Sequence, residues 1–306
     1  MKILITGGAG FIGSNLAEFL LNNDHDIILV DDLSTGKIEN INHLLDRLQF
    51  VEQKVELLDL SSFEDINSVI HLAAQASVPL SISEFKQSSS TNILASINVI
   101  DFCSKQNIPL IYASSSAVYG DLELGNDNES GVDLLSPYAV DKYVLELYAK
   151  VSKELYQLSS IGLRFFNVYG PKQDPSSPYS GVISIFVDRL LKGQPIQING
   201  GHQTRDFIYI DDAVRCIYNS LEVVVSSCVC ERINILTGSV TSIDALADEL
   251  SEQIEASVEK IYKPLEPGDL EESNGTKEKM IEMLNIKPDS LTSLSEGLKQ
   301  TIDFLN

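Results

Sequence analysis

The stretch Lys2-Ile-Leu-Ile-Thr6-Gly7-Gly-Ala-Gly10-Phe-Ile-Gly13 decides the fold of this chain. Its apolar beginning predicts a buried strand, and the glycines that follow predict a tight turn that opens a helix. Gly7 would permit the turn, Gly10 would let the backbone approach a pyrophosphate, and Gly13 would allow the helix to pack closely on the strand. Phosphates bind well at a helix N-terminus, where backbone N–H groups lack intrahelical partners. The stretch therefore predicts a dinucleotide site directly after the first strand.

Asp31 follows the next apolar run, Asp26–Val30. A carboxylate at this place can accept hydrogen bonds from the ribose of an adenosine, and it would repel the additional phosphate of NADP. The sequence therefore predicts NAD as the cofactor.

Short apolar runs alternate with helical patterns through the first half of the chain. Such alternation is typical of a parallel sheet with helices on both faces. Right-handed crossovers make it a doubly wound sheet, which binds its ligand at the carboxyl ends of the strands. The expected fold class is therefore α/β. The expected strands are Lys2–Thr6, Asp26–Val30, Gln49–Val51, Ser68–Leu72, Pro109–Ala113 and Ser160–Arg164, and the expected helices are Ile12–Asn22, Ile93–Gln106 and Tyr138–Gln157.

The pattern changes after Asn167, and the rest of the chain predicts a second, smaller α/β lobe. Residues 171–179 are typical of a loop that leaves the sheet. We divide the chain into a first domain, residues 1–166 with a returning segment at about 207–236, and a second domain, residues 167–206 and 237–306. The expected elements beyond the loop are the helices Gly181–Leu191, Asp211–Leu221 and Ser242–Ile254, the strands Asp206–Ile210 and Glu231–Leu236, and two further helices after Lys263.

The composition limits the classes of partner. A formal charge of −22 opposes binding to nucleic acid and to anionic membranes. No apolar run reaches the length of a membrane span. Met1 leads directly into the first expected strand and leaves no room for a signal peptide, so we expect a cytoplasmic protein. We expect neither a disulfide framework nor a metal site from Cys103, Cys216, Cys228 and Cys230.

Tyr138 and Lys142 in Ser136-Pro-Tyr-Ala-Val-Asp-Lys142 are the candidate catalytic pair. Residues four apart share one face of a helix. A phenol with a pKa of about 10 is a poor base at neutral pH, but a neighbouring ammonium favours the phenolate and lowers that pKa. An acid–base group beside a redox cofactor can move a hydride to or from a carbon that bears a hydroxyl. Without the glycine turn upstream, the same pair would indicate only an amphipathic helix.

Ser114, Ser115 and Ser116 follow the expected strand Pro109–Ala113, so their hydroxyl groups should lie at the ligand edge of the sheet. Ser115 or Ser116 could bond a substrate hydroxyl and relay its proton to Tyr138. Serines in a turn often bond only the backbone, but the tyrosine–lysine pair downstream favours the catalytic interpretation.

These motifs resemble those of the extended short-chain dehydrogenase/reductases, and most of all those of the UDP-sugar 4-epimerases. The resemblance implies a Rossmann-like NAD domain, a smaller α/β UDP-sugar domain, and a homodimer that forms through a four-helix bundle. The similarity extends nearly from end to end, through Ile5-Thr-Gly-Gly-Ala-Gly-Phe-Ile-Gly13, Asp31-Asp-Leu-Ser-Thr-Gly36, His71-Leu-Ala-Ala74, Ser114-Ser-Ser-Ala-Val-Tyr-Gly120, Tyr138 with Lys142, Leu163-Arg-Phe-Phe-Asn-Val-Tyr-Gly-Pro171 and Arg205-Asp-Phe207.

By this resemblance, Ser115, Tyr138 and Lys142 are catalytic, and two sets of residues bind the ligands. Arg205 is also the best diphosphate ligand on physical grounds, because a guanidinium offers a charge-assisted fork to phosphate. The expected cofactor residues are Gly7, Gly10, Phe11, Ile12, Gly13, Asp31, Leu33, Ser34, Thr35, Gly36, Asp59, Leu60, Leu72, Ala73, Ala74, Asn92, Ser114, Tyr138, Lys142 and Phe165. The expected substrate residues are Ser77, Ser115, Ser116, Tyr138, Asn167, Gly181, Val182, Gln197, Asn199, Arg205, Asp269 and Ser273.

Two details narrow the branch of the family. A sugar-nucleotide 4,6-dehydratase would be expected to carry an acid pair after its catalytic hydroxyl residue, but Ser115 is followed by Ser116 and Ala117. In the family the position of Ser273 gates the sugar pocket, where a tyrosine excludes an N-acetyl group and a small residue admits it. The loop Gly170–Val182 also resembles that of epimerases acting on N-acetylhexosamine nucleotides. The alternative interpretation of Ser273 is a surface serine without a role.

Two departures from the family lie near the C-terminus. Family members usually carry an arginine shortly before Gly268-Asp269, where it pairs with the diphosphate, whereas this chain has Leu265-Glu266-Pro267. A carboxylate there would repel phosphate unless the loop turns it outward. Otherwise Lys260 or Lys263 compensates, or the affinity for the diphosphate is weak, or the substrate differs. In addition, Asn274-Gly-Thr276 stands where relatives have Ala-Asp.

The sequence thus leads to the hypothesis of an NAD-dependent 4-epimerase that interconverts UDP-N-acetylglucosamine and UDP-N-acetylgalactosamine through a 4-keto intermediate. The first alternative is the UDP-glucose/UDP-galactose pair. A second is another reaction of the same fold on a nucleotide sugar, and a third is a catalytically silent NAD-binding protein.

Overall fold

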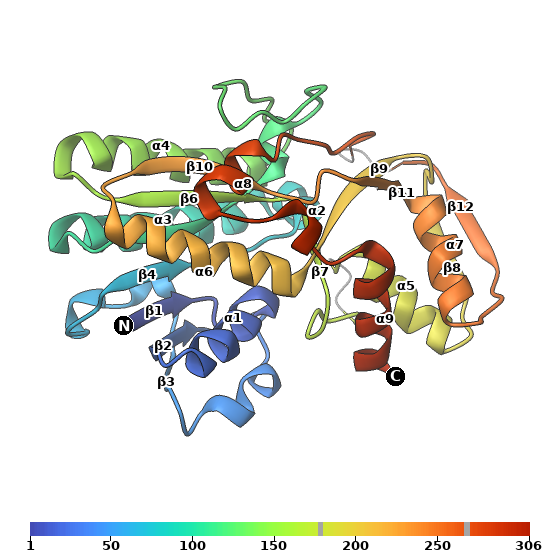
Figure 1. The fold of residues 1–306 in the computed structure, drawn as a ribbon, viewed down its shortest axis with the longest axis horizontal. Helices are drawn as coiled ribbons and strands as arrows, with labels where there is room; N and C mark the ends of the chain where they lie inside the picture. The colour runs from blue at the N-terminus through green and yellow to red at the C-terminus, as the bar shows by residue number, and fades with distance from the viewer. Residues whose placement is uncertain (177–179, 266–269) are drawn as a thin grey trace.

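A parallel sheet runs through the larger of two lobes in the computed structural model, which describes residues 1–176, 180–265 and 270–306 (Figure 1). Within these residues the sheet has seven strands in the order β10-β6-β5-β4-β1-β2-β3, and all neighbours are parallel. The strands are β1 (Lys2–Thr6), β2 (Asp26–Asp31), β3 (Gln49–Glu52), β4 (Ser68–His71), β5 (Leu110–Ser115), β6 (Ser160–Phe165) and β10 (Cys230–Ile235).

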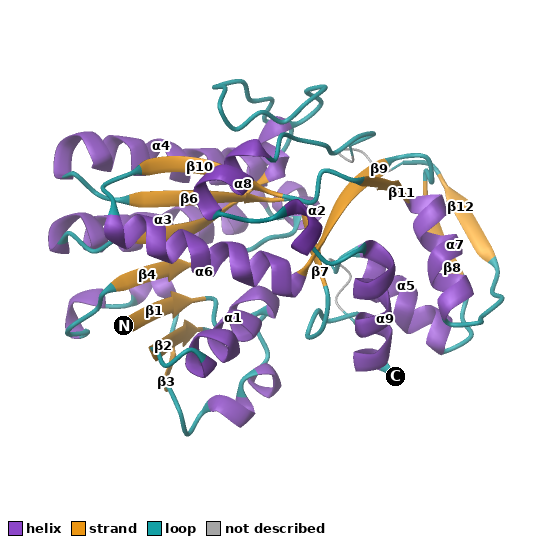
Figure 2. Cartoon of the chain, viewed as in Figure 1, coloured by secondary structure: helices purple, strands orange, loops and turns teal. Residues whose placement is uncertain are grey.

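Helices cover both faces of this sheet (Figure 2). Along β1 the side chains alternate, so that Ile3 and Ile5 pack with α1 (Phe11–Asn22) and α6 (Ile210–Ser226) in one core. Leu4 packs in a second core with α3 (Phe85–Gln106) and α4 (Pro137–Tyr156). The expected α/β class with a doubly wound parallel sheet is confirmed.

The strand order changes direction between β1 and β4. From β1 the chain proceeds to β2 and β3 on one side, and it then returns to β4 on the other side of β1. The connections leave a crevice at the carboxyl ends of the strands at such a point. The glycine turn after β1 therefore lies where this fold binds ligands.

The smaller lobe is built mainly from the chain after β6 (Figure 1). Its strand β9 leads into α6, which returns the chain to the larger lobe, where β10 pairs with β6. One small sheet joins β7 (Asn167–Tyr169), β9 (Thr204–Tyr209) and β11 (Val240–Ser242), a second joins β8 (Ile196–Asn199) to β12 (Lys260–Lys263), and the helices are α5 (Val182–Leu191), α7 (Ile243–Gln253) and α9 (Leu294–Leu305).

Several boundaries differ from the sequence-based expectation. Helix α3 begins at Phe85 rather than Ile93, because the serine-rich first turns have no apolar periodicity that would reveal them. Strand β5 extends through Ser114 and Ser115, which we had expected to follow it. Helix α8 (Glu278–Leu284) packs on α6 and β10, although our division gave residues 237–306 to the second domain. The elements β7, β8, β11, β12 and α2 (Val78–Ser83) were not expected, since each is too short for a repeating pattern to stand out in the sequence.

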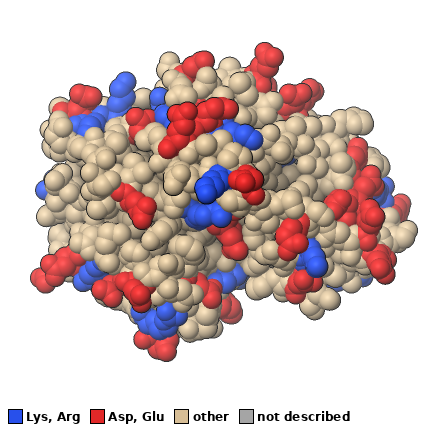
Figure 3. All heavy atoms as spheres, viewed as in Figure 1, with Lys and Arg blue, Asp and Glu red and all other residues tan. Residues whose placement is uncertain are grey.

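Acidic side chains are scattered over both lobes on the face drawn in Figure 3, in keeping with the formal charge of −22. Within the described residues, no helix is both long enough and apolar enough to cross a membrane.

Candidate active site

A cavity of about 810 Å³ lies at the carboxyl ends of the sheet strands. The larger lobe contributes the glycine turn, the ends of β4 and β5, and the start of α4. The smaller lobe contributes Gly181–Ile183, Arg205, Leu270 and Ser273. Both lobes therefore surround one site that is large enough for more than one small molecule.

The glycine turn has the geometry that a pyrophosphate requires. Gly7 has a positive φ of 74°, and a Cβ added there would lie 2.7 Å from the backbone nitrogen of Ala73. A Cβ on Gly13 would lie 2.1 Å from the Gly7 carbonyl oxygen. Gly10 precedes α1 without a side-chain cap, so the first N–H groups of α1 are available for an anion. These residues fit the phosphates of a dinucleotide.

Asp31 holds the glycine turn in place from the end of β2. Its carboxylate accepts a hydrogen bond from the backbone N–H of Ala9 at 2.9 Å and another from Leu33 at 2.9 Å. Burial raises the pKa of Asp31, against the effect of these hydrogen bonds. The same side chain lines the cavity, so it can both order the turn and face an adenosine ribose.

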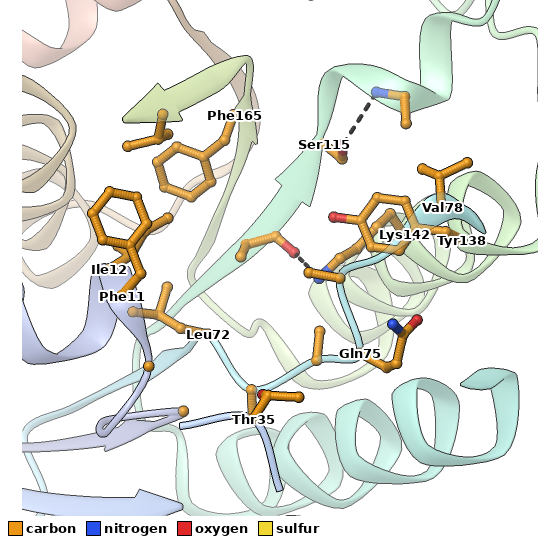
Figure 4. Close-up of a pocket in the computed structure, with 18 of the residues that line it drawn as sticks. Phe11, Ile12, Thr35, Leu72, Gln75, Val78, Ser115, Tyr138, Lys142 and Phe165 are labelled. Atoms are coloured by element: carbon orange, nitrogen blue, oxygen red, sulfur yellow. Dashed lines mark hydrogen bonds between the residues drawn. The ribbon is translucent and has the colours of Figure 1, made fainter. Parts of the chain in front are cut away.

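Tyr138, Lys142 and Ser115 meet at one side of the cavity, and Phe11, Ile12 and Phe165 lie opposite them (Figure 4). Tyr138 enters on the first turn of α4, which Ser136 caps by accepting a hydrogen bond from Ala139. The ammonium of Lys142 lies 5.7 Å from the centre of the Tyr138 ring. It also donates a hydrogen bond of 2.8 Å to the carbonyl oxygen of Ala113 on β5.

The pKa values of this pair correct one expectation. We expected Lys142 to lower the pKa of Tyr138, but in the protein alone burial raises that pKa, while hydrogen bonding with Ser115 opposes the rise. Burial also lowers the pKa of Lys142 to about 8, against the attraction of Asp141. Burial dominates because both side chains are at least nine-tenths covered.

The buried charge of Lys142 should cost stability at neutral pH. The pKa of Lys142 is about 8 in the folded protein, against an ordinary value of 10.5, so the unfolded state binds more protons at pH values between these two. The free energy of unfolding therefore rises with pH between about 8 and 10.5 as Lys142 loses its proton, and the full destabilisation by the buried ammonium is present below pH 8. Lys142→Met should raise the free energy of unfolding more at pH 7 than at pH 9.5, by about 2 kcal/mol. Urea unfolding of both proteins at the two pH values measures this difference, and an equal effect at both would contradict the shift.

Most of the expected ligand residues line the cavity. From the larger lobe these are Gly7, Gly10, Phe11, Ile12, Gly13, Asp31, Ser34, Thr35, Leu72, Ala73, Ala74, Ser114, Ser115, Ser116, Tyr138, Lys142 and Phe165. From the remaining chain they are Asn167, Gly181, Val182, Arg205 and Ser273. The expected residue Asp269 and the departure Glu266 lie outside the described residues.

Other expected cofactor residues lie behind the cavity wall. Leu60 is buried in the core beneath α3, and Asp59 caps the turn that contains Leu60. The side-chain oxygen of Asn92 accepts a hydrogen bond from the backbone N–H of Gln75 at 2.8 Å, so Asn92 supports the wall through Gln75. Neither Leu33 nor Gly36 contributes to the lining, although both adjoin residues that do.

The expected substrate residues Ser77, Gln197 and Asn199 also do not line the cavity. Ser77 caps α2 by accepting a hydrogen bond from the Leu80 backbone N–H at 3.1 Å. On β8, Gln197 donates to Asn199 at 2.8 Å. A helix cap and a pair along one strand satisfy these side chains locally, which the sequence alone did not reveal.

Sequence reasoning missed several lining residues. Gln75 directly follows the motif His71–Ala74, so its position next to that motif could have identified it. Glu84 and Gln87 come from the unexpected start of α3, and no pattern marks them. Phe166 and Leu270 reach the wall only through the tertiary structure. Across the described ranges, His, Cys, Asp and Glu side chains form no cluster that could hold a metal ion.

Known proteins resemble this chain over almost its whole length. Residues 3–235 match the model of the NAD dependent epimerase/dehydratase family. The UDP-glucose 4-epimerase of Thermotoga maritima, solved with UDP-glucose, is 36% identical with a TM-score of 0.92 and covers 99% of this chain and 98% of its own. The UDP-N-acetylglucosamine 4-epimerase of Methanobrevibacter ruminantium M1, solved with UDP-N-acetylmuramic acid, is 34% identical with a TM-score of 0.92, covering 99% and 97%. The UDP-glucuronic acid 4-epimerase of Bacillus cereus, solved with UDP-glucuronic acid and NAD, is 31% identical with a TM-score of 0.92, covering 100% and 99%.

Proposed function

Because the chain belongs to the NAD dependent epimerase/dehydratase family and is an NAD-dependent UDP-sugar 4-epimerase, we propose that it interconverts UDP-N-acetylglucosamine and UDP-N-acetylgalactosamine. The observation that carries the choice of sugar is Ser273, a small residue in the wall of the cavity that also contains Tyr138. A tyrosine at this place would fill the volume that an acetamide needs. The alternative of a catalytically silent protein is disfavoured, because the candidate catalytic residues Ser115, Tyr138 and Lys142 all line the cavity.

The side chains of the protein transfer the proton and bind the diphosphate. Tyr138, as the phenolate, accepts the proton of the sugar 4-hydroxyl, and Ser115 steers that hydroxyl. NAD, held by the glycine turn and Asp31, would supply the hydride acceptor and donor for the sugar C4, and a positively charged cofactor there would favour the phenolate of Tyr138. Lys142 adds a second positive charge beside Tyr138, while Arg205 binds the diphosphate. Because proton and hydride both return, no net oxidation occurs.

The charges of the cavity favour a neutral sugar. Among the described lining residues, the cations are Lys54, Lys142 and Arg205. Lys54 is assigned to the adenosine side of the site. Lys142 is assigned to Tyr138, and Arg205 is assigned to the diphosphate. A glucuronic acid carboxylate would need a further cation to offset the cost of its burial. The proposed substrates carry no charge on the sugar.

Incubation with UDP-N-acetylglucosamine, and separately with UDP-glucose, tests the proposal. The products are separated by anion-exchange chromatography and identified by proton NMR. A galacto isomer from the acetylated sugar is the expected result. Conversion of UDP-glucose alone would keep the 4-epimerase activity and replace the proposed substrate by the UDP-glucose/UDP-galactose pair, which the Thermotoga relative makes the next candidate.

Ser273→Tyr should lower kcat/KM for UDP-N-acetylglucosamine by about 10–200-fold, because excess volume in a sugar pocket acts against the larger substrate. Activity on UDP-glucose should fall much less. Ser273→Ala is the matched control, since it removes the hydroxyl and keeps the space, and it should retain activity on the acetylated sugar. Equal losses on both sugars in the tyrosine variant would show that Ser273 does not select the substrate.

We also propose that two copies of the chain pair through α3 and α4. These helices pack side by side and present an apolar face to the outside. A contiguous face of this kind on a monomer marks an interaction site, and a two-fold axis would complete a four-helix bundle from two identical pairs. The exposed apolar side chains of α3 and α4 include Leu94, Ile97, Val140, Leu147, Tyr148, Val151 and Leu155.

The double variant Leu147→Glu with Val151→Glu should convert the dimer to a monomer, because it would place unpaired carboxylates in an apolar contact between the two copies. Analytical ultracentrifugation measures the mass of each protein. Val240→Glu on β11 is a matched control, because Val240 is similarly exposed but lies outside α3 and α4. A wild-type monomer, or a double variant that remains dimeric, would contradict this interface.

A further inference from the structure

Residues 270–276 form a wall segment that carries Leu270 and Ser273 into the cavity. The wall segment lies outside the helices and strands of the fold, so hydrogen bonds at its two ends must fix its position. At one end the carbonyl oxygen of Glu271 accepts a hydrogen bond of 2.9 Å from the backbone of Thr204, next to Arg205. At the other end the wall segment pairs with Gly125 of the larger lobe.

The pairing at Gly125 is a short parallel bridge. The N–H of Gly125 donates to the Asn274 carbonyl oxygen at 3.1 Å, and the Gly125 carbonyl oxygen accepts from the N–H of Thr276 at 2.9 Å. Both strands of the bridge need glycine at its centre. A Cβ on Gly275 would lie 2.7 Å from the Phe166 ring and 2.9 Å from the Gly125 carbonyl oxygen. The close approach therefore places the wall segment directly against Phe166, which also lines the cavity.

Asn234 on β10 holds this bridge together. Its amide nitrogen donates to the carbonyl oxygens of Gly125 at 2.9 Å and Thr276 at 3.0 Å, one on each side of the bridge. Its amide oxygen accepts from the Tyr119 hydroxyl at 2.7 Å. Asn234 is completely buried, and every polar group of its side chain has a partner. A buried amide with three such bonds is costly to disturb and specifies one arrangement.

Asp127 adds a second connection between β10 and the wall segment. Its carboxylate accepts a hydrogen bond from the backbone N–H of Asn234 at 2.9 Å and another from the Thr276 hydroxyl at 3.1 Å. Asp127 is also completely buried. Thr276 belongs to the departure Asn274-Gly-Thr276 noted in the sequence, and here its hydroxyl has a specific partner.

We propose that Asn234 is a positioning residue that holds the wall segment, and with it Ser273, at a fixed distance from the catalytic side of the cavity. Asn234 does not line the cavity, so it acts through the bridge rather than by touching the substrate. The expected consequence of this positioning is substrate selectivity. A wall segment held in one place fits one size of sugar, whereas a loosened wall segment discriminates less between an acetylated and a plain hexose. This inference rests on the proposed function of the same cavity.

Two variants loosen the wall by different routes. Asn234→Ala removes all three side-chain bonds, and Gly275→Ala displaces the wall segment while Asn234 stays intact. Both should lower the ratio of kcat/KM for UDP-N-acetylglucosamine to that for UDP-glucose by about tenfold, the scale on which pocket fit discriminates one group. The NAD content of the purified protein should stay unchanged. Tyr119→Phe is the matched control, because it removes the bond on the side of Asn234 that faces away from the wall segment, together with a hydrogen bond to Arg164, and leaves both bonds to the bridge intact. It should change the ratio less than about twofold.

The outcomes separate this inference from the proposed function. A merely structural role would lower both kcat/KM values together and leave their ratio unchanged, which would overturn the positioning role. If the wild type prefers UDP-glucose, the proposed substrate is wrong, but a ratio that moves in both variants still supports the positioning role. Calorimetric titration with each UDP-sugar provides a second readout, the ratio of the two dissociation constants. If the wild type binds neither sugar, both the proposed function and this inference are wrong.

Discussion

Tyr138→Phe is expected to lower kcat for UDP-sugar epimerisation at least about a hundredfold, because a positioned acid–base group typically supplies a factor of 10²–10⁴. Phenylalanine keeps the ring that packs at the start of α4 and removes only the hydroxyl, so the fold should persist. Bound NAD should remain, since the glycine turn and Asp31 are untouched. Turnover is measured by NMR of the nucleotide sugars, and NAD content by its release on denaturation.

Tyr143→Phe is the matched control for this variant. Tyr143 lies on the same helix and is partly buried, but it does not line the cavity, so its loss of a hydroxyl should leave kcat nearly unchanged. Residual activity of the Tyr138 variant above about one per cent would contradict the acid–base role. A second readout is the absorbance of reduced nicotinamide on addition of substrate, which should be absent in the Tyr138 variant because the proton cannot leave.

Glu146→Gln is expected to lower the free energy of unfolding by about 3–5 kcal/mol, because it leaves a buried arginine without its counter-charge. Arg164 on β6 donates two hydrogen bonds to the Glu146 carboxylate, at 2.8 Å and 2.6 Å, and both side chains are almost fully buried. Burial opposes the charge of Arg164, but Glu146 outweighs it and raises the pKa of that guanidinium. Ser114 also donates to Glu146 at 2.6 Å, so the pair supports the strand that carries Ser115.

Urea unfolding at a fixed, saturating NAD concentration measures this loss, since bound cofactor contributes to the observed stability. Adding Arg164→Met to Glu146→Gln should recover most of the stability, because no unpaired buried charge then remains. Asp101→Asn is a control for an exposed pair: it breaks the ion pair with Lys105, and it should change stability little because solvent screens that pair. A loss below about 1 kcal/mol for Glu146→Gln would show that Arg164 finds other partners or water.

The expected fold was confirmed where a local pattern is long and regular. The strand and turn at Lys2–Gly13, the alternation that follows, and the placement of Tyr138 and Lys142 on one helix all depend on neighbours in sequence. The start of α3 was wrong because its serines hide the periodicity, and the short strands of the smaller lobe were missed because three or four residues do not define a period.

The cavity, by contrast, is lined by residues that lie far apart in the sequence. Sequence motifs identified the candidate pair Tyr138 and Lys142 and the glycine turn, because each is a short segment whose spacing already fixes its geometry. Only the tertiary structure brings Arg205 and Ser273 to the same cavity as Tyr138, and only it shows that Ser77 caps a helix. It also decides that Tyr138 has a raised pKa and Lys142 a lowered one. Burial is a property of the folded chain as a whole, so neither the protonation of these two groups nor the connection from Asn234 to the wall segment could be obtained from residues adjacent in sequence.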